Sequence, residues 1–83
     1  MSVFEQLRQL LHEDFEIPVE KLTRGATLED LEIDSLRMIE ILFSVEEKFG
    51  ITIQAEQAEL RTRLKTFGDL AGYIEALVPN KAS

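Results

Sequence analysis

No cysteine occurs in the chain of 83 residues, and this absence excludes several kinds of chemistry. Without a thiol there is no disulfide framework, no thiolate metal site and no cysteine nucleophile. No apolar run is long enough to span a membrane. The segment MSVFEQLRQLLHED carries charges within its apolar pattern and does not resemble a signal peptide. These absences fit a reducing cytoplasm, which is the location we expect.

Basic residues are also few, with 9 Lys and Arg against 16 Asp and Glu and a net charge of −7. Such a balance argues against nucleic acid or an anionic membrane as a partner, and favours proteins with basic patches. A chain this short buries a modest core and has no room for a deep enzyme cleft. We therefore expect a monomeric, non-enzymatic domain over residues 1–79, followed by a frayed tail over residues 80–83.

The spacing of apolar residues predicts an all-α fold, a small bundle of three main helices plus one short helix. The first helix is expected over residues 3–14, with Ser2 as its N-cap. The second is expected over residues 35–49, and Gly50 suits the left-handed position that ends it. Because this second helix is apolar around much of its circumference, it either lies centrally or keeps apolar surface for a partner.

The remaining segments connect and complete this bundle. Residues 15–31 form a long connection whose scattered apolar side chains predict that it packs onto the core. Residues 51–53 are expected to be an extended link, and residues 55–65 favour one or two helical turns. Thr66 begins the last helix with the pattern of a capping box, and Pro79 stops that helix.

The start of the second helix combines an acidic residue and a hydroxyl, Asp34-Ser35. Both residue types are favoured N-caps, so a purely structural role for Ser35 stays open. A catalytic serine needs a base and an oxyanion site. The single histidine, His12, is expected to face water, so it is not a candidate base. The sequence around Ser35 also lacks the G-x-S-x-G pattern of a nucleophile elbow. We expect no catalytic residue. An exposed hydroxyl here could instead carry an anionic phosphoryl group, which a helix N-terminus favours.

The acidic residues of the same region also raise the hypothesis of a metal site, with less support than the attachment hypothesis. Asp30, Glu32 and Asp34 alternate as in the first half of a calcium-binding loop. The glycine and the distal glutamate that such a loop needs are missing. We therefore expect no metal site.

The residues around Ser35 resemble the acyl carrier proteins. Asp34-Ser35-Leu36 matches the D-S-L motif of that family, and Ile39-Glu40-Ile41 and Glu46-Glu47-Lys48-Phe49 follow it as in family members. The resemblance covers nearly the whole chain. It implies that Ser35 is esterified by 4′-phosphopantetheine from coenzyme A and that the arm carries acyl groups as thioesters, while the protein itself catalyses nothing.

The resemblance also implies partners. A phosphopantetheinyl transferase would add the arm, and acyl-transferring, condensing or acyl-activating enzymes with basic docking patches would use it. The residues implied in docking are Asp34, Leu36, Met38, Glu40 and Glu47. Those that could line a space for the acyl chain are Ile39, Leu42, Phe43 and Phe49. The docking residues could simply form a solvated helix face, and the chain-lining residues could simply fill the core.

Several positions depart from the family pattern. Glu32 stands where glycine is common, and Arg37 stands where family members often keep an acidic or neutral polar residue. Arg61, Arg63 and Lys65 add positive charge to a segment that is usually acidic or neutral. These changes indicate a specialised carrier for fatty-acid or related lipid or secondary-metabolite synthesis. Open alternatives are an aminoacyl, D-alanyl or peptidyl carrier, or an unmodified helical interaction module.

Overall fold

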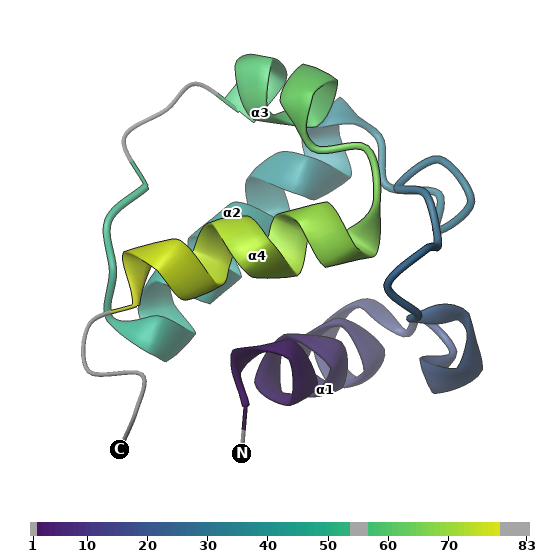
Figure 1. The fold of residues 1–83 in the computed structure, drawn as a ribbon, viewed down its shortest axis with the longest axis horizontal. Coiled ribbons are helices and arrows are strands. Elements are labelled where there is room, and N and C mark those ends of the chain that lie inside the picture. Colours follow the sequence, from purple (N-terminus) through teal and green to yellow (C-terminus); the bar gives the residue numbers. More distant parts are fainter. Residues whose placement is uncertain (1, 54–56, 79–83) are drawn as a thin grey trace.

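The computed structural model describes residues 2–53 and 57–78, so the predicted tail and Pro79 lie outside the described residues. The described elements are α1 (Val3–Phe15), the one-turn 3₁₀ helix η1 (Val19–Lys21), α2 (Ser35–Phe49), α3 (Gln57–Arg63) and α4 (Phe67–Leu77). In Figure 1, α4 crosses the centre of the molecule between α1 and α3, with α2 behind it. The predicted all-α fold, with three main helices and one short one, is confirmed.

The helix ends follow the local signals of the sequence. The Ser2 hydroxyl accepts the backbone N–H of Glu5 at 3.1 Å and caps α1. Gly50 ends α2 in the left-handed conformation, with φ 66°. At the start of α4, the Thr66 hydroxyl accepts the N–H of Asp69 at 3.1 Å, and the Asp69 carboxylate accepts the N–H of Thr66 at 3.2 Å. These bonds satisfy terminal backbone groups that have no partner inside the helix.

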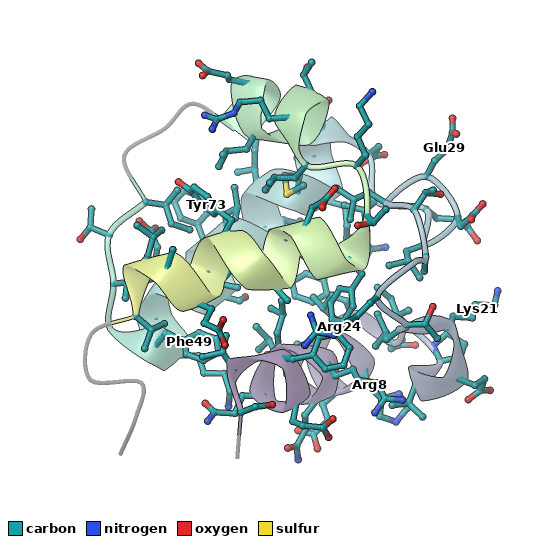
Figure 2. The ribbon with its side chains drawn as sticks, in the orientation of Figure 1. Arg8, Lys21, Arg24, Glu29, Phe49 and Tyr73 are labelled. Carbon is teal, nitrogen blue, oxygen red and sulfur yellow. The ribbon has the colours of Figure 1, made fainter. Side chains whose placement is uncertain are left out.

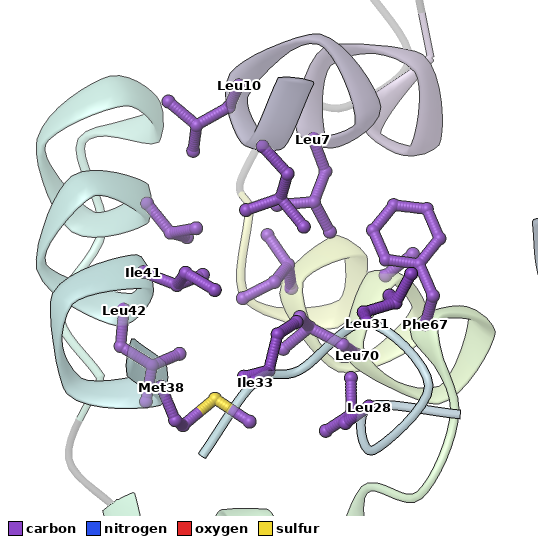
Figure 3. Packing of buried hydrophobic residues seen from close by; sticks show 14 of the residues in the cluster. Leu7, Leu10, Leu28, Leu31, Ile33, Met38, Ile41, Leu42, Phe67 and Leu70 are labelled. Atoms are coloured by element: carbon purple, nitrogen blue, oxygen red, sulfur yellow. The ribbon is translucent and has the colours of Figure 1, made fainter. Parts of the chain in front are cut away.

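One apolar core joins the three main helices. Figure 3 shows Leu7 of α1, Ile41 of α2 and Leu70 of α4 within it, and all three side chains are fully buried. The connection between α1 and α2 adds five more buried side chains, Ile17, Leu22, Leu28, Leu31 and Ile33. The prediction that this connection packs onto the core is therefore confirmed. No polar or charged side chain is buried among the described residues, so the fold depends on apolar burial.

Polar contacts also hold the middle of the same connection. Arg8 of α1, labelled in Figure 2, donates from Nε to the carbonyl of Leu22 at 3.0 Å. Near the start of α4, the N–H of Phe67 donates to the carbonyl of Ala26 at 2.8 Å. The segment that leads into α2 is thus attached to two other helices.

Two short segments lie between the main helices. The one-turn helix η1 was not predicted, because three residues are too few to show a helical period. Residues 51–53 have neither helix nor strand, as expected of an extended link, and the Glu46 carboxylate accepts the N–H of Ile53 at 2.7 Å. This bond fastens the link to α2.

Candidate functional site

The N-cap of α2 is Asp34. Its backbone is extended, and its Oδ1 accepts the N–H of Arg37 at 2.8 Å. Ser35 therefore occupies the first helical position, and the cap does not use its hydroxyl. Ser35 is also exposed, which leaves its Oγ open to an incoming group beside the first-turn N–H groups of α2.

The turn before α2 determines which of the following residues lie at the surface and which are buried. Glu32 has φ 59°, in the left-handed region where glycine carries no steric penalty. The next residue, Ile33, is 1% exposed and donates its N–H to the carbonyl of Leu28 at 2.9 Å. The reversal at Glu32 thus buries Ile33 and leaves Asp34 and Ser35 at the surface.

An exposed stripe of alternating apolar and acidic residues runs along α2. At 100° per residue, its four members fall within an arc of about 60°. We call them the α2 stripe: Leu36, Glu40, Phe43 and Glu47. All four are exposed, and the side chains of Leu36 and Phe43 are 66% and 61% exposed although they are large and apolar. The opposite side of the helix holds its buried residues, Met38, Ile41, Leu42 and Val45.

This placement corrects two predictions. Met38 was expected to dock partners, but its side chain is 0% exposed and belongs to the core. Phe43 was expected to line an internal space, but its side chain lies on the surface. Residue type alone misassigned both, because α2 is apolar around much of its circumference and only its packing decides which apolar side chains face water.

The other three predicted chain-lining residues share one side of α2 with Ser35. Leu42 is buried, whereas Ile39 and Phe49 are half-buried. At 100° per residue, Ser35, Ile39 and Leu42 lie within about 60° of one another. Glu46, which holds the extended link at Ile53, lies within the same arc. This side of α2 therefore faces the link.

Arg37 lies on the other side of α2. Its guanidinium carbon is 5.7 Å from the centre of the Phe15 ring at the end of α1. The sequence indicated Phe15 only as an apolar residue that packs onto the core. Its contact with Arg37 was not predicted, because the two residues are far apart along the chain and share no pattern.

The histidine has a structural contact of its own. His12 is exposed, as predicted, and its Nδ1 lies 2.9 Å from the carbonyl oxygen of Ile17. Because that oxygen is an acceptor, Nδ1 must carry the proton in this contact. The ring thereby supports the turn after α1.

The described residues contain no group of three or more side chains that could hold a metal ion. Within the same ranges, the helices are all too short or too polar to cross a membrane.

Comparison with known proteins identifies the family. The model of the phosphopantetheine attachment site family matches residues 5–74. An acyl carrier protein of Streptococcus pneumoniae serotype 4 is 35% identical over 75 residues, which cover 90% of this chain and 95% of the relative. One from Helicobacter acinonychis is 37% identical over 76 residues, covering 90% and 94%. The chain therefore belongs to the acyl carrier proteins, which bear a covalent 4′-phosphopantetheine and carry acyl groups without catalysing reactions.

Proposed function

We propose that Ser35 is the attachment residue and that the protein is a specialised cytoplasmic carrier for fatty-acid, related lipid or secondary-metabolite synthesis. The observation that supports the attachment most is the cap, because Asp34 takes that role and leaves the Ser35 hydroxyl exposed. A phosphoryl ester at this position gains from the first-turn N–H groups and the helix dipole. When bound, the arm supplies the thiol on which acyl groups travel.

Intact mass after incubation with coenzyme A and a broad-specificity phosphopantetheinyl transferase tests the attachment. The wild type should gain one phosphopantetheine, and Ser35→Ala should gain none. Ser44→Ala, which removes a half-buried hydroxyl from the same helix, should still gain one. If several transferases leave the wild type unmodified, Ser35 is not an attachment residue and an unmodified interaction module becomes the better reading.

The α2 stripe and Asp34 form the docking face in this proposal. Two exposed apolar side chains alternate with Glu40 and Glu47, so a partner with an apolar centre and flanking cations would complement them. Glu40→Lys or Glu47→Lys should lower the kcat/KM of the transferase about tenfold at low salt. Glu75→Lys on α4 makes the same charge change at an exposed position outside the stripe and serves as the control. Equal losses in all three variants would contradict docking through α2.

The side of α2 that carries Ser35 is the proposed shelter for the acyl chain. Leu42, Ile39 and Phe49 supply its apolar surface. Loading the holo-protein with a medium-length acyl chain should shift the methyl NMR signals of Ile39 and Leu42 more than those of Leu7 in α1. Equal shifts at all three would contradict a local shelter.

Specialisation is tested separately from attachment. Arg37 and Lys65 are exposed cations where the family pattern is acidic or neutral, and they make a dedicated partner set the better hypothesis. Efficient chain elongation on this carrier by housekeeping fatty-acid synthesis enzymes would contradict it. Selective loading by an amino-acid-activating enzyme would instead assign an aminoacyl or peptidyl cargo.

A further inference from the structure

We infer that Arg37 determines partner specificity: it selects a protein that places a carboxylate against the first turn of α2 and disfavours one that places a cation there. The inference rests on the proposed docking role of α2 and specifies the chemistry of the partner surface.

Arg37 is the one positive charge in an acidic stretch of the sequence. No other Lys or Arg occurs between Gly25 and Glu47, whereas that stretch holds seven acidic residues, Glu29, Asp30, Glu32, Asp34, Glu40, Glu46 and Glu47. Arg37 is exposed, and the ion pairs found among residues 2–53 and 57–78 do not include it. Its charge is therefore available to a partner.

The Phe15 ring holds the guanidinium in a defined direction. The distance of 5.7 Å from the guanidinium carbon to the ring centre lies within the range of a cation–π contact. A guanidinium over an aromatic face still has N–H donors at its edge. That edge matches a carboxylate, which can accept two parallel hydrogen bonds from it. Because the ring already restricts the side chain, less conformational freedom is lost on binding.

The surroundings of Arg37 connect it to the docking face. It borders a surface hollow between the end of α1 and the start of α2, whose other charged side chains are Glu16, Lys21, Asp30 and Glu32. Leu31, Ile17 and Phe15 add apolar surface to this hollow. Arg37 also follows Leu36 directly in the chain and precedes Glu40 by three residues, so it adjoins the α2 stripe. A partner laid along the stripe would reach it.

The phosphoryl group at Ser35 is a poor match for this guanidinium. At 100° per residue, the side chains of Ser35 and Arg37 leave α2 about 160° apart. The contact with Phe15 directs Arg37 toward α1, whereas Ser35 shares the side of the extended link. The complementary anion therefore belongs to a partner protein.

The first experiment measures kcat/KM for coenzyme A-dependent modification by a housekeeping transferase whose docking face is basic. Arg37→Glu should raise it about tenfold, because it removes a like-charge contact, and Arg37→Gln should give an intermediate gain. Lys48→Glu is the matched control: it lies on the same side of α2 but in the last turn, and should change the rate less than about twofold. An unchanged or lower rate for Arg37→Glu overturns the inference.

The second experiment tests attraction. Each arginine or lysine of the transferase docking face is changed singly to glutamate, and every variant is assayed with wild type and Arg37→Glu. The unchanged transferase should prefer the Arg37→Glu carrier over the wild-type carrier. One transferase variant should reverse that preference and modify the wild-type carrier about tenfold faster than the Arg37→Glu carrier. If no variant reverses it, Arg37 does not recognise a carboxylate. Absence of any adduct on intact mass, in every combination, would overturn the proposed function itself, whereas adducts formed at equal rates overturn only this inference.

Discussion

The carboxylate of Asp34 accepts a hydrogen bond from the backbone N–H of Arg37 at 2.8 Å. Neighbouring residues therefore divide two tasks at the start of α2. Asp34 satisfies the helix backbone, and Ser35 presents an exposed hydroxyl one position later. Chemistry at Ser35 can proceed without removing the cap.

This division predicts different costs for two substitutions. Asp34→Ala should lower the free energy of unfolding by about 1 kcal/mol, because it removes the cap, while Asp34→Asn should keep most of it. Ser35→Ala should change the unfolding free energy by less than about 0.5 kcal/mol. Urea unfolding followed by circular dichroism measures all three. A loss at Ser35→Ala as large as at Asp34→Ala would show that Ser35 is the true cap.

The local features of the fold were predictable because short sequence patterns encode them. Ser2, Gly50 and the Thr66–Asp69 capping box lie where the sequence indicates, since each needs only residues within one helical turn. The same holds for the exposed hydroxyl of Ser35, whose neighbours carry the family motif.

The misassigned features depend on contacts between distant segments. Met38 and Phe43 are both large and apolar, and only the packing of α2 against α3 and the rest of the core buries one and exposes the other. The contact of Arg37 with Phe15 joins two elements that share no sequence pattern. Residue type and spacing therefore predicted the exposure of Ser35 better than they predicted which side of α2 is buried.

The backbone of Glu32 predicts a stabilising substitution. A non-glycine residue pays about 1–2 kcal/mol to adopt the left-handed conformation that Glu32 has at φ 59°. Glycine avoids that cost but loses about 0.5–1 kcal/mol through its greater freedom in the unfolded chain. Glu32→Gly should therefore raise the unfolding free energy by about 0.5–1 kcal/mol in urea.

Glu29→Gly is the control for this substitution. Glu29 is an exposed residue of the same connection, and its φ is not positive. Glu29→Gly removes the same kind of side chain without relieving backbone strain, so it should not stabilise the protein. If the two variants have equal effects, the backbone of Glu32 is not strained.

Two glycines of α4 form a second matched pair. A Cβ added at Gly68 would lie 2.8 Å from the backbone carbonyl oxygen of Arg24, whereas one at Gly72 would meet nothing within 4 Å. Gly68→Ala should therefore destabilise the protein by about 1–3 kcal/mol through overpacking. Gly72→Ala should stabilise it by up to about 1 kcal/mol, because alanine favours the helix. Thermal unfolding of both variants measures the contrast, and stabilisation by both would show that the loop at Arg24 moves away easily.

Met38 and Phe43 separate the contribution of α2 to folding from its proposed role in docking. Met38→Ala removes a fully buried side chain and should cost about 2–5 kcal/mol of unfolding free energy. Phe43→Ala removes a side chain that is 61% exposed, so the unfolding free energy should change by less than about 0.5 kcal/mol.

Phe43→Ala should instead weaken docking, because a large exposed apolar residue on the α2 stripe contributes contact area only when a partner covers it. With the transferase as partner, Phe43→Ala should raise KM by about fivefold with little change in kcat. A Phe43→Ala protein that is strongly destabilised would place this ring in the core, and one with an unchanged KM would remove it from the docking face.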